Sequence, residues 1–419
     1  MSKLSVLADS LVGSEIVKLG NEINLRKSRG EQIFNYTIGD FDPQIFPIPQ
    51  ELETFIIKAY QDKQTNYPPG DGILPLRQAV GDWFRRVFNI DFSNEEIQIS
   101  SGGRPIIYTI FKTLVDPGDK VIYTVPSWNN NHYTHMNAGK HCILEVTPEN
   151  NFMPTAADIA PHLKGAALLC LCSPQNPTGT TLDKEELIRI CNLVLEENRS
   201  RGADEKKLYI MFDQMYWTLT YGDVEHHNPV SLVPDIKAYS IFVDGISKAF
   251  AATGVRVGWA LGPKDVIGKI RAFLSHIGAW APLAEQIATA QFLNDHQAVD
   301  TYLAGLKKGL QERLEYIYSR IMKMKAAGLP VDAIAPQAAL YLTIKLDFKG
   351  YRYRDIMLDN QSDVTQFILS EAKLAIVPFN CFGADRNNPW YRVSVGTCTM
   401  DDLQQAFDQL ETALTQLTR

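Results

Sequence analysis

Short apolar runs alternate with longer helical patterns from about residue 96 to residue 262 of this 419-residue chain. The segments between the runs repeat apolar positions three and four residues apart, and Asp183 with Glu186 predicts a capping box at the start of one of these helices. Such alternation predicts an α/β fold with a mostly parallel, doubly wound sheet. The predicted strands are 97–100, 120–124, 142–146, 167–172, 208–212, 239–243 and 257–261.

The flanking regions carry other patterns. Residues 1–30 form a polar, helix-tending arm without a core of its own, which we expect to pack on another part of the protein or on another subunit. Helical patterns cover 49–63, 74–87 and a long segment at 282–327, and a strand pattern covers 341–346. The predicted domains are an N-terminal arm with part of a small domain (1–45), a large domain (46–290), and a linking helix with a small α/β domain (291–419).

Composition narrows the class of protein. The chain is 45% hydrophobic and 21% charged, as in ordinary globular proteins, and its net charge of −7 argues against non-specific nucleic-acid binding. It shows no apolar core of a signal peptide and no run near the roughly 18 residues of a spanning helix. The six cysteines have no CxxC pair and no zinc spacing. We therefore expect a cytoplasmic protein that acts on small charged metabolites, with no metal, nucleic-acid or membrane partner.

Polar or glycine-rich segments follow several of the predicted strands, at the edge where doubly wound sheets bind ligands. Gly102 and Gly103 precede a helical pattern, so their backbone N–H groups could hold a phosphate, although a plain tight turn is the favoured alternative. Trp128 follows the next strand, where it could stack on a planar ligand or simply pack.

Three later segments carry more chemistry. Asn176 lies between two prolines, which fix its position or merely shape a loop. Asp213 ends a buried run, where a carboxylate is costly unless it meets a positive group, and an ion pair with an arginine is the structural alternative. Lys248 follows another buried strand, where desolvation lowers the pKa of a lysine and permits Schiff-base chemistry. A lysine that extends to solvent is the alternative there.

The segments SPQNPTG, DQMY and SKAFAATGVRVGW occur in the order found in the aspartate aminotransferase superfamily, the fold type I pyridoxal-phosphate enzymes. In the last segment an arginine follows the lysine after eight residues. The chain resembles this family from about Gly39 to Arg392. The resemblance implies a fold type I transferase, with a mostly parallel sheet in a large domain and a smaller α/β domain.

The resemblance also implies pyridoxal phosphate as the cofactor and a role for each matching residue. Lys248 would hold the cofactor as a Schiff base and carry the proton at the substrate α-carbon, and Asp213 would pair with the ring nitrogen. Tyr216 and Asn176 would hydrogen-bond the phenolic oxygen of the ring and so lower the pKa of the Schiff base. The other implied contacts are Arg256 and Ser247 at the phosphate, the amides around Gly102, Gly103 and Arg104, and Trp128, which stacks on the ring and, like Asn176, faces the substrate.

Further matches concern the substrate and the assembly. Arg392, in the segment YRVS, would clamp the substrate α-carboxylate, and the backbone N–H of Gly39 would help to hold it. Tyr67 matches a tyrosine that reaches the cofactor phosphate of the neighbouring subunit, which implies a homodimer with shared active sites. No arginine lies in register within 272–282 to bind a distal carboxylate, so aspartate-like specificity and an aromatic or broad specificity both stay open.

The predicted function is that of a pyridoxal-phosphate-dependent aminotransferase, which moves an amino group from an L-amino acid to a 2-oxo acid in two ping-pong half-reactions. A lyase or decarboxylase of the same fold is the first alternative, because the reaction depends on which bond of the α-carbon lies perpendicular to the ring. A cofactor-binding regulator without turnover is less favoured, since no helix-turn-helix pattern precedes residue 40 and both the lysine and the carboxylate clamp are present.

Overall fold

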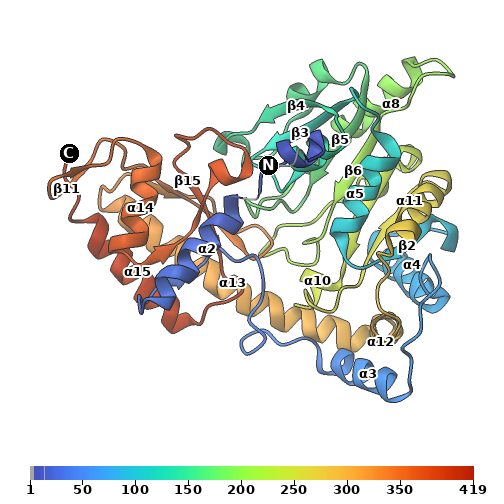
Figure 1. Ribbon diagram of the computed structural model, residues 1–419, viewed down its shortest axis with the longest axis horizontal. Helices are drawn as coiled ribbons and strands as arrows, with labels where there is room; N and C mark the ends of the chain where they lie inside the picture. The colour runs from blue at the N-terminus through green and yellow to red at the C-terminus, as the bar shows by residue number, and fades with distance from the viewer. Residues whose placement is uncertain (1–3, 14) are drawn as a thin grey trace.

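A seven-stranded sheet forms the centre of the larger part of the molecule in the computed structural model, which describes residues 4–13 and 15–419 (Figure 1). Its strands are β2 (Ile97–Ser100), β3 (Lys120–Val125), β4 (Lys140–Glu145), β5 (Ala166–Cys172), β6 (Tyr209–Asp213), β7 (Ser240–Gly245) and β8 (Gly258–Leu261). Their order is β2-β8-β7-β6-β5-β3-β4. The pairs from β7 to β4 are all parallel, whereas β8 is antiparallel to both of its neighbours. The mostly parallel α/β fold predicted from the sequence is confirmed.

Helices cover both faces of this sheet, which explains why its strands are continuous apolar runs. Phe212 packs into the core shared with α4 (Leu74–Phe88) and α8 (Lys184–Ser200). Its neighbour Met211 points to the other face and packs into the core shared with α5 (Gly103–Leu114) and α11 (Lys264–Ile277). The other helices of this part are α3 (Gln50–Gln61), α6 (Asn130–Met136), α7 (Ala156–Ile159), α9 (Pro229–Leu232), α10 (Ile246–Ala249) and α12 (Leu283–Asn294).

A second hydrophobic core surrounds a four-stranded antiparallel sheet in the C-terminal part of the chain. This sheet has the order β14-β15-β10-β9. Its strands are β9 (Val331–Ala333), β10 (Tyr341–Leu346), β14 (Val377–Pro378) and β15 (Trp390–Ser394), and the helices α14 (Gln361–Glu371) and α15 (Met400–Leu414) belong to the same part. The remaining short strands are β1 (Phe34–Asn35), which pairs with β13 (Leu374–Ala375), and β11 (Arg352–Tyr353), which pairs with β12 (Ile356–Met357).

A single long helix, α13 (His296–Ala326), runs from α12 to the C-terminal elements (Figure 1). The helical pattern predicted over 282–327 is interrupted at Asp295, whose side chain accepts a hydrogen bond from the backbone N–H of Ala298 and so caps α13. The domain boundaries predicted from the sequence stay predictions. Within the described residues, none of the helices combines the length and the apolar character that crossing a membrane requires.

The N-terminal arm packs on the C-terminal part. Its helices are α1 (Val6–Ser10) and α2 (Glu15–Ser28). Ile23 of α2 is fully buried beside Leu369 of α14, and the guanidinium of Arg26 donates to the Ser370 hydroxyl at 3.3 Å. The expectation that the arm packs on another part of the protein is confirmed, and Figure 1 shows α2 in front of the C-terminal elements.

The capping box predicted for α8 is wrong in one half. Asp183 does cap the helix, because its carboxylate accepts from the backbone N–H groups of Glu185 and Glu186. The side chain of Glu186 instead accepts from the backbone N–H of Ala156 at 2.8 Å. The Glu186 carboxylate, which the local pattern predicted to bond to the start of its own helix, thus bonds to Ala156 of another helix instead.

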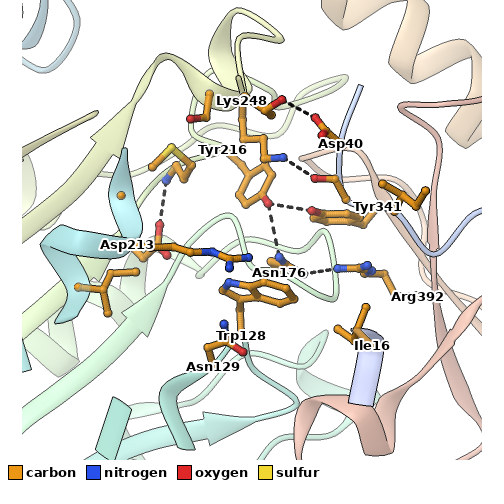
Figure 2. Close-up of a pocket in the computed structure, with 18 of the residues that line it drawn as sticks. Ile16, Asp40, Trp128, Asn129, Asn176, Asp213, Tyr216, Lys248, Tyr341 and Arg392 are labelled. Atoms are coloured by element: carbon orange, nitrogen blue, oxygen red, sulfur yellow. Dashed lines mark hydrogen bonds between the residues drawn. The ribbon is translucent and has the colours of Figure 1, made fainter. Parts of the chain in front are cut away.

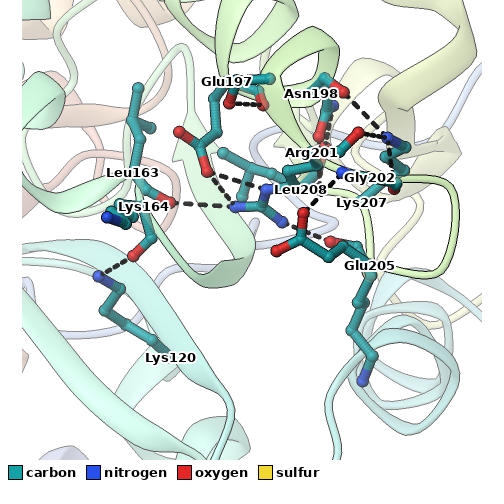
Figure 3. A network of polar contacts seen from close by, with 12 residues as sticks. Lys120, Leu163, Lys164, Glu197, Asn198, Arg201, Gly202, Glu205, Lys207 and Leu208 are labelled. Carbon is teal, nitrogen blue, oxygen red and sulfur yellow. Dashed lines mark hydrogen bonds and ion pairs between the residues drawn. The ribbon is translucent and has the colours of Figure 1, made fainter.

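A polar network fixes the connection from α8 to β6 at the far edge of the sheet (Figure 3). The amide of Asn198 exchanges two hydrogen bonds of 2.8 Å with the backbone of Leu208, just before β6. Arg201 bonds to the Glu197 carboxylate at 2.9 Å and to the carbonyl oxygen of Leu163 at 3.1 Å. These bonds hold the start of the strand that carries Asp213 at its end.

Gly179, at the end of the SPQNPTG segment, touches β10 too closely for any side chain. Its φ is +71°, and a Cβ there would lie 2.3 Å from the carbonyl oxygen of Tyr341. Gly179→Ala should therefore lower the melting temperature through backbone strain of about 1–2 kcal/mol and overpacking of about 1–3 kcal/mol. Gly165→Ala is the matched control, because Gly165 has a φ of +72° and nothing within 4 Å of its Cβ. Equal melting temperatures for the two variants in calorimetry would contradict the steric contribution.

Candidate active site

A cavity of about 630 Å³ lies at the carboxyl edge of the seven-stranded sheet, where residues of the four-stranded sheet close it (Figure 2). Its volume lies within the range of about 300–1,000 Å³ that is typical of small-molecule sites. The sequence-predicted residues that line it are Gly39, Gly103, Arg104, Trp128, Asn176, Asp213, Tyr216, Ser247, Lys248, Arg256 and Arg392.

Strand direction brings these residues together from distant parts of the sequence. Parallel β5, β6 and β7 end at one edge, so that Asn176, Asp213 and Lys248 follow their strands there. Because β8 is antiparallel, it begins at the same edge, and Arg256 lies just before it. Arg392 comes from β15 of the other sheet. Figure 2 shows Asp213 and Arg392 at opposite sides of the cavity, with Lys248 above and Trp128 below.

Lys248 points into the cavity from the short helix α10, and its ammonium group donates a hydrogen bond to the carbonyl oxygen of Gly39. Burial lowers the pKa of Lys248 to about 8. The carboxylate of Asp40 opposes this shift, while the charges of Arg392 and the other arginines in the cavity add to it. The alternative of a lysine that extends to solvent is wrong. Near pH 8, a large fraction of the molecules has Lys248 as a neutral amine.

Asp213 presents a buried carboxyl group to the cavity. It accepts a hydrogen bond of 3.1 Å from the backbone N–H of Met215, and it has no ion pair within the described part of the chain. Burial raises the pKa of Asp213 to about 6. The alternative of a structural ion pair with an arginine is therefore wrong for the described residues. A carboxyl group in this state is well placed to meet a cationic group of a ligand.

Hydrogen bonds join Arg392 to Tyr216 through Asn176. The Arg392 guanidinium donates to the side-chain oxygen of Asn176 at 2.9 Å, and the amide nitrogen of Asn176 donates to the Tyr216 hydroxyl at 3.4 Å. Arg392 is only 1% exposed, and its Nε–H has no partner among the described residues. An unpaired buried donor next to a cavity is suited to a ligand carboxylate.

Gly102 leaves the space that the Arg256 guanidinium occupies. Gly102 has a φ of +92°, and a Cβ on it would lie 2.1 Å from the Arg256 guanidinium. The guanidinium can therefore donate to the carbonyl oxygen of Ser101 at 2.8 Å. Helix α5 begins at Gly103, so its first N–H groups lie on the same side as Arg256. A helix start beside a guanidinium is a suitable site for a phosphate.

Two predicted residues do not line the cavity. Gly102 lies behind Arg256, as its close contact shows. Tyr67 is 86% exposed and packs edge-on against Trp280, with ring centroids 5.4 Å apart, in a separate groove of about 690 Å³. Within one chain, Tyr67 is thus not part of the site.

Other lining residues were not found from the sequence. Ile16 and Val17 reach the cavity from α2, whose polar composition gave no sign of a site. Asp40 accepts a hydrogen bond of 2.6 Å from the hydroxyl of Thr253, which lies in the segment that follows Lys248. Tyr341 enters from β10, within an apolar run that predicted a strand and nothing more. For Asp40 the sequence offered one signal, the neighbouring Gly39. That glycine predicted that the loop reaches the site, but it did not predict a role for the Asp40 carboxylate.

The family model "Aminotransferase class I and II" matches residues 34–410. The chain belongs to this family. It is 28% identical to the probable aspartate/prephenate aminotransferase of Rickettsia felis, over 99% of this chain and 97% of that protein. It is also 28% identical to the aspartate aminotransferase of Geobacillus stearothermophilus, over 97% of this chain and 98% of that protein. The crystal structure of the aspartate aminotransferase from Rhizobium meliloti has the same fold, with a TM-score of 0.91 at 23% identity over all of both chains. The predicted family, the fold type I fold and the aminotransferase class are confirmed.

The lowered pKa of Lys248 predicts how the cofactor-free aminotransferase reacts with an amine reagent. Only the neutral amine is nucleophilic, so acetylation of Lys248 by acetic anhydride should rise with pH, reach half its maximum near pH 8, and then level off. In the urea-unfolded chain the half-maximum should move to about pH 10.4. Mass spectrometry of the labelled peptide gives both curves. Identical midpoints for the folded and unfolded chain would contradict the shift.

Proposed function

We propose that this class I and II aminotransferase uses pyridoxal phosphate to transfer the amino group of an L-amino acid to a 2-oxo acid in two half-reactions. The main support is the combination of three groups in one cavity. Lys248 has a lowered pKa, and among residues 4–13 and 15–419 the buried carboxyl group of Asp213 has no ion pair and the Nε–H of Arg392 has no acceptor. Asp213 lacks a charged partner and Arg392 lacks one acceptor among the described residues, and the cofactor and an amino acid would supply these groups.

The lining residues fit the cofactor. Asp213 would meet the protonated pyridine nitrogen, which provides the positive charge that its surroundings lack. Arg256, Ser247 and the first amides of α5 would hold the phosphate, in the place that Gly102 keeps open. Trp128 would lie against the ring. When bound, pyridoxal phosphate supplies the electron sink that makes the α-proton of an amino acid removable.

The protein would then orient the substrate and move one proton. Arg392 would bind the α-carboxylate through its unpaired Nε–H, beside the backbone of Gly39. Tyr216 and Asn176 would donate hydrogen bonds to the phenolic oxygen of the ring. The amine of Lys248 would take the proton from the α-carbon and deliver it in the second half of the transfer, a task for which a pKa near the working pH is favourable.

We propose a dicarboxylic amino acid, such as aspartate, as the substrate. Lys248, Arg256 and Arg392 already have proposed roles at the α-proton, the phosphate and the α-carboxylate. Arg104 has none. It has no ion pair among the described residues and lines the cavity, with its guanidinium 5.3 Å from the centre of the Trp128 ring. A guanidinium held against a flat ring is suited to a second carboxylate. The names of the two relatives agree with this choice. The apolar side chain of Ile16 is the observation that favours an aromatic or broad specificity instead.

A panel of amino acids mixed with the cofactor-loaded protein tests the function. L-Aspartate should convert the absorption of the bound cofactor to that of the pyridoxamine form and release an equal amount of oxaloacetate. Release of ammonia or carbon dioxide in place of the 2-oxo acid would indicate a lyase or a decarboxylase. No reaction with any amino acid would favour a binding protein without turnover.

Variants of Arg104 test the choice of substrate. Arg104→Gln should lower kcat/KM for aspartate by about 10- to 100-fold, the effect of one charged hydrogen bond. It should leave kcat/KM for phenylalanine within about three-fold. Arg386→Gln, at an exposed site outside the cavity, is the control and should change neither value. Equal losses for aspartate and phenylalanine would show that Arg104 does not read the side chain.

We propose that the active protein is a homodimer in which Tyr67 contacts the cofactor phosphate of the partner subunit. Its support is the position of Tyr67, which is exposed and outside the cavity of its own chain. Sedimentation equilibrium should give twice the mass of the chain. Tyr67→Phe should weaken cofactor binding by about 10-fold, as expected for a lost hydrogen bond to a phosphate. A fully active monomer would contradict the proposal.

A further inference from the structure

We propose that Tyr341 is a positioning residue, which donates a hydrogen bond to Tyr216 and thereby directs the Tyr216 hydroxyl proton into the cavity. The inference rests on the proposed function, in which Tyr216 donates that proton to the phenolic oxygen of pyridoxal phosphate. Tyr341 lines the cavity but lies outside the sequence motifs that predicted the site.

Tyr341 and Tyr216 meet where the two sheets approach each other. Tyr341 is the first residue of β10, and Tyr216 follows β6. Their hydroxyl oxygens are 2.8 Å apart, and their rings meet edge to face with centroids 5.5 Å apart (Figure 2). The two side chains are 2% and 5% exposed, so water has little access to either hydroxyl.

The proposed function gives the direction of this bond. Among the described residues, the polar partner of the Tyr341 hydroxyl is the hydroxyl of Tyr216, and either oxygen could be the donor. When Tyr216 gives its own proton to the ligand, the bond between the two hydroxyls requires the proton of Tyr341. Tyr341 then donates, and the oxygen of Tyr216 accepts.

Asn176 supplies a second donor to the same oxygen. The orientation of its amide is set by Arg392, which has only donors and so must face the amide oxygen, at 2.9 Å. The amide nitrogen then donates to Tyr216 at 3.4 Å. A hydroxyl has two acceptor positions and one proton. Since both acceptor positions of Tyr216 are filled, its own proton is free for a ligand in the cavity.

The two accepted bonds make Tyr216 a stronger donor, because hydrogen bonds in a chain polarise one another. With pyridoxal phosphate bound, a stronger donor would favour the anionic form of its phenolic oxygen and would lower the pH midpoint of the cofactor absorption band. Tyr341 would thus act on the cofactor without touching it. Its ring also lies beneath the Arg392 guanidinium, at 4.6 Å from the centroid, and this contact does not require the hydroxyl.

Tyr341→Phe removes the hydroxyl and keeps the ring. In the cofactor-loaded protein, we expect the pH midpoint of the cofactor absorption band to rise by about 0.2–0.6 unit, from a weakening of about 10–30% in one charged hydrogen bond. The shift should disappear when Tyr216→Phe is already present, because Tyr341 acts through that residue. A double-mutant cycle followed by spectrophotometric titration measures both effects.

Tyr391→Phe is the matched control. Tyr391 is a fully buried tyrosine next to Arg392, and its hydroxyl contacts Gln361 and Thr365 but not Tyr216. Its loss should leave the midpoint unchanged. An unchanged midpoint in Tyr341→Phe, or the same shift in the Tyr216→Phe background, would overturn the role of Tyr341 alone. A wild-type protein without any pH-dependent cofactor band would overturn the proposed function as well.

Discussion

Four cationic side chains line one cavity, and burial together with their mutual repulsion controls the charge of the lysine among them. Lys248, Arg104, Arg256 and Arg392 all line it, and each arginine lowers the pKa of the lysine, although burial is the larger cause. Asp213 lines the same cavity with a raised pKa, and it forms no ion pair within the part of the chain that the structure describes. Such an arrangement is stabilised by ligands that bring negative charge to the arginines and positive charge to the aspartate. A phosphate, a substrate carboxylate and a protonated ring nitrogen together have this pattern of charges.

The two sheets make different contributions to this cavity. The seven-stranded sheet supplies the residues proposed for the cofactor, because its parallel strands end at one edge and β8 begins there. The four-stranded sheet supplies Arg392 and Tyr341, which line the side of the cavity proposed for the substrate. Their bonds to Asn176 and Tyr216 cross from one sheet to the other. The group proposed for the substrate carboxylate and the groups proposed for the ring are therefore parts of one hydrogen-bonded chain.

Much of this could be predicted because it is local in the sequence. Buried strands are apolar runs whatever their direction, so β2 and β10 were predicted with the bounds that the structure has, and β4 was displaced by two residues at its start and one at its end. Lys248 and Asp213 were found from their strand ends and from motifs. Tyr341 and Asp40 were missed because their roles arise from contacts between distant segments, which leave no periodic signal. The capping bond predicted for Glu186 was wrong for the same reason, since its partner Ala156 belongs to another helix.

The reversed direction of β8 sets a fixed interval in the chain. Lys248 follows β7 and Arg256 precedes β8 at one edge of the sheet, so only eight residue steps separate the lysine proposed to bind the cofactor from the arginine proposed for its phosphate. This short loop would fix the separation between the lysine and the guanidinium that the proposed cofactor has to bridge. An inserted or deleted residue here would separate these two residues, whereas connections at the opposite edge can lengthen without changing that distance. Tolerance to changes in chain length should therefore differ between the two edges of the same sheet.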